Sequence, residues 1–149
     1  MVSVQQIKAL RESTGAGISD VKKALEESGG DMEKATSALL RALGSSAEKR
    51  AGRETKAGII EVYSHANGRI GAMAHMSCET DFVARNPEFK WLAHEIAMQI
   101  AAMDPADVSA LYSQPFIKDA GKTVGNVIDE AIGRFGENIK IERFTRYDA

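Results

Sequence analysis

Hydrophobic residues in the first 43 positions recur at helical spacing in three short groups. The groups are separated at residues 13–17 and 28–31, where glycine lies beside Ser, Thr or Asp. Glycine frees the backbone after one helix, and a Ser or Asp side chain caps the next helix. The sequence therefore predicts a bundle of three short helices. Its apolar positions are Val4, Ile7 and Leu10, then Ile18, Val21 and Leu25, then Ala35, Leu39 and Leu43.

The next stretch, residues 45–56, contains small and charged residues and has no apolar face. Such a composition is typical of a polar tether between folded parts, with the alternative that one end of the tether is helical. We therefore expect three segments along the chain: a helical domain over residues 1–44, a linker over 45–56 and a second domain over 57–149.

The hydrophobic pattern changes to a period of two after Gly58, which is typical of a strand. Asn67-Gly68 follows and favours a two-residue hairpin turn, so the chain should return from Arg69 to about Cys78. Alternation near the C-terminus predicts a third strand, and the whole pattern indicates a small antiparallel sheet. The alternating positions are Ile59, Glu61 and Tyr63 against Ile60 and Val62, and later Ile139 and Ile141 against Lys140 and Glu142, with Phe144 following.

Two amphipathic helices are predicted beside this sheet. The first begins at Asn86-Pro87, a cap followed by a first-turn proline, and ends at Asp104-Pro105. The second covers about residues 123–135 and stops at Gly136. The fold class is therefore α+β: an N-terminal three-helix bundle, then a small antiparallel sheet with flanking helices.

Composition excludes several classes of protein. The chain has 149 residues, 44% hydrophobic and 27% charged, which is too apolar for a wholly disordered chain. Its 19 basic and 21 acidic residues lack the excess of positive charge that nucleic-acid binding requires, so we expect no direct nucleic-acid partner. No apolar run reaches the roughly 18 to 20 residues that cross a bilayer, and the start lacks a signal-peptide pattern. We expect no membrane partner and a reducing, cytoplasmic location.

The single cysteine, Cys78, lies three residues from both His75 and Asp81, which raises the hypothesis of a thiol nucleophile. Residues 75 and 78 of one strand point to opposite faces, however, so a buried and inert cysteine is favoured. The histidines His65 and His94 have no metal-ligand spacing to each other or to His75. We predict no catalytic residue, no metal and no cofactor.

The junction between the second strand and the long helix, residues 77–86, combines polar and aromatic residues. A carboxylate beside a large ring can act as a wedge: Phe82 would enter an apolar crevice while Asp81 meets a cation or a helix N-terminus. Composition alone favours the simpler interpretation, in which Phe82 is a buried hinge residue and Asp81 is a helix cap.

Three ordered blocks of the sequence resemble the elongation factor Ts family. They are LRESTGAG at residues 10–17 with DVKKAL at 20–25, then CETDFVAR at 78–85, then QPFIKD at 114–119 with KTVG at 122–125 and GENI at 136–139. The resemblance covers nearly the whole chain and implies a ubiquitin-associated-type N-terminal domain. It also implies a guanine-nucleotide exchange factor that promotes release of GDP from elongation factor Tu and performs no chemistry of its own.

The resemblance also implies which residues bind that GTPase. In the family, the Asp-Phe pair of the signature inserts between helices of the nucleotide domain and disturbs the magnesium site. That role passes here to Asp81 and Phe82, with Thr80 and Val83 supporting them, and it reverses the preference for a buried hinge. The head domain contacts another helix of the same GTPase domain. The matching positions are Arg11, Ile18, Ser19 and Lys22.

One departure from the family bears on the assembly. Only residues 103–114 separate the long helix from Gln-Pro-Phe, where many members carry a long helical insertion, and the chain has material for a single core half. A homodimer would supply two halves, with its interface on the sheet and flanking helices. The main alternative function is a protein-binding adaptor with the same type of head. A thiol enzyme built on Cys78 is a more distant hypothesis.

Overall fold

The computed structural model describes residues 1–149 and divides into two compact units. The helical unit contains residues 1–52 with 129–136, and the sheet unit contains residues 53–128 with 137–149. Helix α7 (Val124–Phe135) contributes residues to both. None of the helices combines the length and apolar character needed to span a membrane.

Three helices fold the N-terminal part, as predicted: α1 (Val4–Thr14), α2 (Ile18–Glu27) and α3 (Met32–Arg50). Ser3 and Gln6 cap α1 reciprocally, and the Asp31 carboxylate caps α3 by accepting the Lys34 N–H at 3.1 Å. Most of the apolar positions that predicted the helices face one another in a small core, but Val4 and Ile18 are 82% and 56% exposed. The buried members of the core are Leu10, Ala16, Val21, Ala24, Leu25, Ala35 and Leu39.

Helix α3 is longer than predicted and includes residues 45–50 of the expected linker. These residues include Ala, Glu, Lys and Arg, which favour helices, and no proline interrupts them. Ala47 is buried, so this last part of α3 is packed as well as helical. A segment that composition marks as a tether therefore has regular structure up to Arg50.

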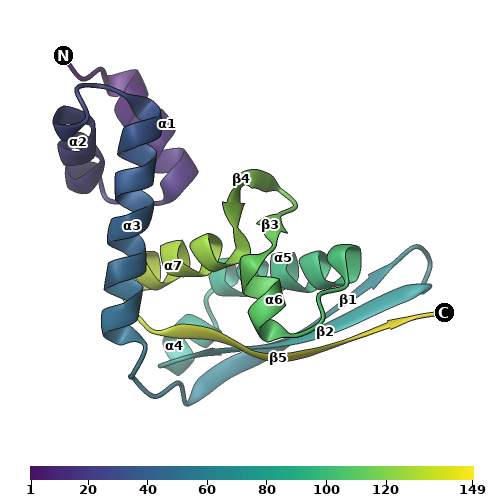
Figure 1. Cartoon of the computed structure of the whole chain (residues 1–149). Coiled ribbons are helices and arrows are strands. Elements are labelled where there is room, and N and C mark those ends of the chain that lie inside the picture. Colours follow the sequence, from purple (N-terminus) through teal and green to yellow (C-terminus); the bar gives the residue numbers. More distant parts are fainter. The chain divides into compact units, whose positions relative to one another are not determined.

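Three antiparallel strands form the sheet of the second unit, also as predicted (Figure 1). They are β1 (Ala57–His65), β2 (Ile70–Cys78) and β5 (Ile139–Asp148), with β2 in the centre. The predicted two-residue turn between β1 and β2 is wrong, because the connection has four residues, 66–69. Its left-handed residues begin at Ala66, one position before Asn67-Gly68, and the Gly68 N–H donates to the His65 carbonyl at 3.2 Å.

One face of the sheet packs against helix α5 (Pro87–Met103), which follows the predicted boundaries. Ala72 and Ala74 of β2 are buried there, and their small side chains let the helix approach the backbone closely. Side chains directly opposite one another on neighbouring strands share a face, so the register divides the sheet into a covered face and an open face.

Four short elements were not predicted. They are α4 (Asp81–Ala84), α6 (Val108–Ser113), β3 (Pro115–Phe116) and β4 (Asp119–Thr123). The buried amide of Gln99 holds the β3–β4 hairpin: it donates to the Pro115 carbonyl at 3.0 Å and accepts the Ile117 N–H at 2.9 Å. Elements this short depend on such contacts and leave no periodic signal.

Candidate functional site

The junction between β2 and α5 folds into the single turn of α4. Thr80 is extended and caps the turn, its hydroxyl accepting the Val83 N–H at 3.4 Å. Asn86 then caps α5 by accepting the Glu88 N–H at 2.9 Å. Two caps thus bracket a short segment whose shape is set by its own side chains.

Phe82 is 89% exposed and lies on the outer side of this turn. The Asp81 carboxylate is also exposed and pairs with Arg85 at 2.8 Å between Oδ2 and Nη2. Val83 and Ala84 are buried. Because neighbours in a helical turn point about 100° apart, burying residues 83 and 84 turns 81 and 82 outward. The simpler prediction is therefore wrong: Phe82 is not a buried hinge, and Thr80 rather than Asp81 is the cap.

Two glutamates hold the base of the turn, and neither was predicted as a site residue. Glu137 Oε1 accepts the backbone N–H groups of Glu79 and Thr80, both at 3.0 Å, and Oε2 accepts the Thr80 hydroxyl at 2.6 Å. In return, Glu79 Oε1 accepts the Asn138 N–H at 2.7 Å. The two partners are 57 to 59 residues apart, so no local pattern announces the contact.

Cys78 lies at the same junction, buried and facing away from solvent. Its Sγ donates to the Thr80 carbonyl at 3.3 Å. Burial and then the negative charge of Glu137 raise the pKa of the Cys78 thiol to about 11. The thiol is therefore protonated at neutral pH, which contradicts the nucleophile hypothesis and agrees with an inert cysteine.

The four predicted head residues, Arg11, Ile18, Ser19 and Lys22, are all exposed on the helical unit. Ile18 is 56% exposed, and it shares one face of α2 with Lys22 because the two are four positions apart. These residues are therefore free to meet a partner, and Arg11 lies near the end of the preceding helix α1.

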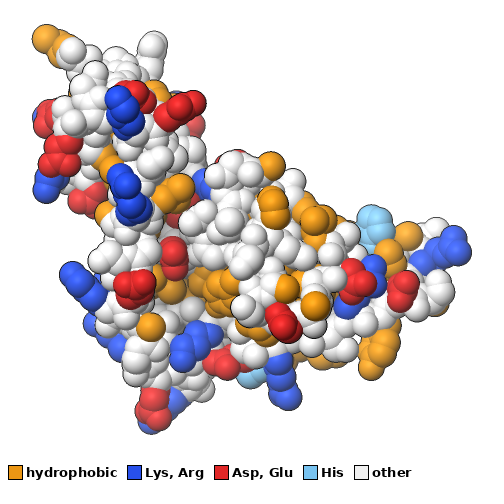
Figure 2. Space-filling model, in the orientation of Figure 1, with side chains coloured by type: hydrophobic (Ala, Val, Ile, Leu, Met, Phe, Trp, Pro, Cys, Tyr) orange, Lys and Arg blue, Asp and Glu red, His pale blue; other side chains and the backbone are white.

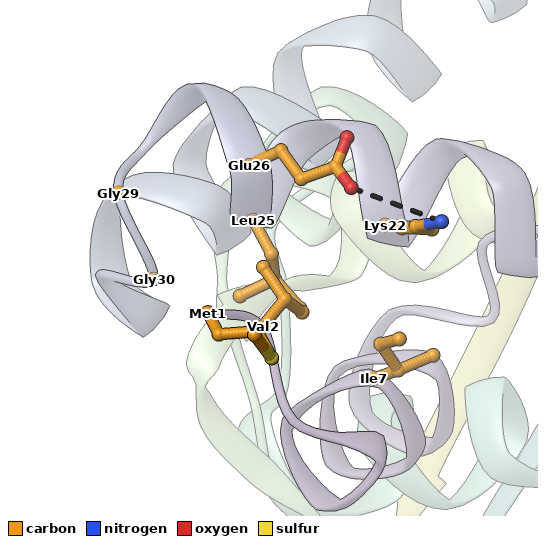
Figure 3. A pocket seen from close by; sticks show the side chains of 8 residues that line it. All are labelled: Met1, Val2, Ile7, Lys22, Leu25, Glu26, Gly29 and Gly30. Carbon is orange, nitrogen blue, oxygen red and sulfur yellow. Dashed lines mark ion pairs between the residues drawn. The ribbon is translucent and has the colours of Figure 1, made fainter.

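A pocket of about 490 Å³ lies beside Lys22 on the same unit. Figure 3 shows the apolar side chains of Val2, Ile7 and Leu25 around it and the ion pair between Lys22 and Glu26, 3.8 Å long, at its edge. Apolar side chains therefore line part of this pocket, and a charged pair lies at its edge.

The open face of the sheet is a second apolar surface. Its rows across the strands are Ile60, His75 and Arg143, then Val62, Met73 and Thr145, then Ser64, Gly71 and Tyr147. Ile60, Val62 and Met73 are 52%, 62% and 44% exposed. Figure 2 shows hydrophobic side chains, in orange, at the surface of the sheet unit between charged side chains. The side chains of Ile60, Val62 and Met73 are therefore neighbours on one exposed face of the sheet.

Fold and site together define a mixed helix-and-sheet protein in which an anchored helical turn presents an aromatic ring to solvent. The family model described as "Elongation factor TS" matches residues 79–149. Elongation factor Ts of Thermotoga petrophila is 45% identical, covering 99% of this chain and 96% of its own length. That of Rubrobacter xylanophilus is 39% identical, covering 97% of both. The chain therefore belongs to the elongation factor Ts family and is a factor of translation elongation.

The lengths of the alignments show that this chain is shorter than some relatives. The Thermotoga alignment spans 190 positions although this chain has 149 residues, so about 40 residues of that relative have no counterpart here. Elongation factor Ts of Aquifex aeolicus is 50% identical over only 153 positions, which cover 99% of this chain and 52% of the relative. The compact arrangement of this chain is thus also present within a longer family member.

Proposed function

We propose that this protein is a guanine-nucleotide exchange factor that binds elongation factor Tu in its GDP form and promotes GDP release by disturbing the magnesium and nucleotide site. It makes and breaks no covalent bond and is not an enzyme in that sense. The observation that carries the proposal is the exposed ring of Phe82, beside the Asp81 carboxylate, on a turn that Glu137 anchors.

Each residue of the wedge has a distinct part. The Phe82 ring enters an apolar crevice between helices of the GTPase domain, and the Asp81 carboxylate exchanges its exposed Arg85 partner for a positive group there. Thr80 and Val83 support the wedge in different ways. The exposed Thr80 caps the turn, and the buried Val83 packs beneath it.

Exchange requires that the GTPase without nucleotide bind this protein more tightly than the GTPase with GDP, because a ligand shifts an equilibrium only by its differential affinity. Burying one phenylalanine contributes about 1.5–3 kcal/mol, and 1.4 kcal/mol is tenfold, so Phe82 can weaken GDP binding roughly 10- to 150-fold. Reciprocity then requires nucleotide to expel this protein by the same factor. The complex is accordingly transient when GTP or GDP is present.

The head domain supplies a second contact. We assign Arg11, Ile18, Ser19 and Lys22 to another helix of the same GTPase domain, on the support of their exposure and of the neighbouring pocket. A head bound at one helix raises the effective concentration of the wedge at its crevice, since both belong to one chain.

We further propose a cytoplasmic homodimer that has no direct contact with nucleic acid. Residues 57–149 would form the dimerisation domain, residues 1–44 the head and residues 45–56 the connection. The support is the open sheet face with Ile60, Val62 and Met73, whose burial against a second copy would remove their apolar surface from water.

The proposal is tested by release of a fluorescent GDP analogue from elongation factor Tu at fixed magnesium. The wild-type chain should accelerate release, and Phe82→Ala should remove most of the acceleration while the circular dichroism spectrum is unchanged. Trp91→Ala is the matched control, because Trp91 is also aromatic and 56% exposed but lies on α5. No acceleration by the folded wild-type chain would reject the proposal.

That negative result would favour the alternative, a protein-binding adaptor. The pocket beside Lys22 is the observation that supports it, since an apolar hollow on the helical unit can hold a side chain of some other protein. Retained binding of a partner through this unit, together with no effect on GDP release, is the result that the adaptor hypothesis expects.

A further inference from the structure

We propose that Glu137 is a positioning residue for exchange: its carboxylate holds the junction of β2 and α4 so that Phe82 faces the partner. The inference rests on the proposed function and assigns a role to a residue outside the wedge itself. Glu137 follows α7 and precedes β5, and it lies beside the wedge only because β5 pairs with β2.

The carboxylate accepts three hydrogen bonds from two consecutive residues. Oε1 is 3.0 Å from both the Glu79 and Thr80 nitrogens, and Oε2 is 2.6 Å from the Thr80 hydroxyl oxygen. Hydrogen bonds to an ionised group are roughly twice as strong as neutral ones. Glu137 therefore fixes both the backbone and the side chain at the residue immediately before the wedge.

The hydroxyl of Thr80 transmits this constraint to α4. It donates its proton to Glu137 and uses a lone pair to accept the Val83 N–H at 3.4 Å. A hydroxyl has one proton, so donation to Glu137 leaves only its lone pairs facing the turn, which is the arrangement that an N-cap needs. The cap holds the turn in which Phe82 points outward and Val83 inward.

Glu79 completes a reciprocal tie. While its N–H binds Glu137, its carboxylate accepts the Asn138 N–H at 2.7 Å and lies 3.6 Å from Arg53 Nη1. The end of β2 and the approach to β5 are thus joined in both directions. Such a closed ring of polar contacts positions its members better than any single bond does.

Glu137→Gln separates this role from simple packing. The amide keeps the size of the side chain and one oxygen for the backbone N–H groups, but its NH2 group replaces the oxygen that accepts the Thr80 hydroxyl. The Thr80 hydroxyl oxygen would then accept a hydrogen bond from this NH2 group, and the hydroxyl could no longer donate a hydrogen bond to residue 137. Glu142→Gln is the matched control, because Glu142 is a β5 carboxylate that accepts hydrogen bonds from Ser77 and Thr55, whereas Glu79 and Thr80 donate to Glu137.

The first readout is amide hydrogen exchange of the full chain. We expect the Glu79 and Thr80 amides to exchange at least about tenfold faster in Glu137→Gln, since each loses part of a charge-assisted bond, while β1 and β2 keep their protection. Glu142→Gln should leave both amides as in wild type. Unchanged exchange at Glu79 and Thr80 in Glu137→Gln would overturn the inference.

The second readout is GDP release from elongation factor Tu. Glu137→Gln should reduce the acceleration about tenfold, yet add less than about twofold in a Phe82→Ala background, because a positioning residue acts through the residue it positions. Equal effects in both backgrounds would overturn the inference. If Glu137→Gln fails to fold, Glu137→Asp keeps the charge but shortens the reach, and the same two results are expected of it.

The two readouts also separate this inference from the proposed function. Suppose that wild type does not accelerate GDP release, but the Glu79 and Thr80 amides exchange faster in Glu137→Gln than in wild type. This result would reject the exchange function and would still support the anchoring by Glu137. Acceleration by wild type that Phe82→Ala abolishes and Glu137→Gln does not change would support exchange and reject the positioning role.

Discussion

Individual side chains at the β2–α4 junction have opposite surroundings although they are close in sequence. Phe82 is 89% exposed and Cys78 is fully buried, only four positions away. Glu137 joins these two environments, since it holds the Thr80 backbone and also raises the pKa of the Cys78 thiol. The protonation states of two single groups, the Cys78 thiol and the Glu142 carboxyl, can be tested directly.

Cys78 should react slowly with thiol reagents. With a pKa of about 11, roughly one molecule in a thousand carries the thiolate at pH 8, against about a quarter for an unperturbed cysteine. Burial slows access further. We expect labelling by Ellman's reagent to be more than about 100-fold faster in denaturant than in the native state. Rapid native labelling would revive the thiol-enzyme hypothesis.

Glu142 should contribute to the acid sensitivity of the fold. The hydrogen bond from the Ser77 hydroxyl, at 2.7 Å, lowers the pKa of the Glu142 carboxyl below its ordinary value. A group with a lowered pKa stabilises the fold above its unfolded pKa and loses that contribution as the pH falls through the folded pKa. The difference in urea midpoint between wild type and Glu142→Gln should therefore be largest at pH 7 and shrink toward about pH 3. A constant difference would contradict this assignment.

At the scale of elements, close approach between strands decides which residues are tolerated. A Cβ added at Gly58 of β1 would lie 2.3 Å from the Met76 carbonyl oxygen of β2. That atom belongs to the backbone and cannot turn aside as a side chain can. Glycine here allows β1 to pair with β2 along its whole length, up to the end that carries the wedge.

Gly58→Ala should consequently lower the free energy of unfolding by about 1–3 kcal/mol, the usual cost of forcing extra volume into a packed site. Gly52→Ala is the control, because nothing lies within 4 Å of a Cβ at Gly52. Its effect should stay within about 0.5 kcal/mol. Urea unfolding of both variants measures the difference. Equal urea midpoints for Gly58→Ala and Gly52→Ala would show that β1 and β2 accommodate the added methyl group without loss of stability.

At the scale of the whole molecule, two features bear on the oligomeric state: the exposed face of the sheet and the shortness of the chain relative to its relatives. The chain has about 40 residues fewer than the Thermotoga alignment spans, and its sheet leaves Ile60, Val62 and Met73 exposed. A second copy would cover that face and would bring two wedges into one assembly. In such a dimer, the proposed acceleration of GDP release would depend on the oligomeric state.

Sedimentation at micromolar concentration should show about twice the 16.1 kDa of one chain. Val62→Lys places a charge at the centre of the open face and should yield a folded monomer. Val4→Lys is the control, because Val4 is also exposed, at 82%, but belongs to the helical unit. A wild-type chain that sediments only as a monomer would reject the homodimer.

Much of this organisation follows from local pattern in the sequence. The three N-terminal helices, the three strands and helices α5 and α7 were predicted because apolar residues repeat at 3.6 or 2 positions, and Gly, Pro and Asn mark the ends. Prediction failed where no repeat exists: at the single turn of α4, at the hairpin that Gln99 holds, and at residues 45–50. The family resemblance pointed to the proposed wedge at residues 80–83, but not to Glu137, which anchors it.

The sequence by itself determined the fold class, the family and the signature that carries Asp81 and Phe82. Tertiary structure decided that Phe82 faces solvent, that Cys78 is protonated and inert, and that Glu137 holds the junction. The hydrophobic pattern depends only on residues that are near in sequence. The exposure of a side chain and the anchoring of the junction depend on groups nearly 60 residues apart, which the pairing of β2 with β5 brings together. The contacts that hold the β2–α4 junction therefore exist only in the folded chain.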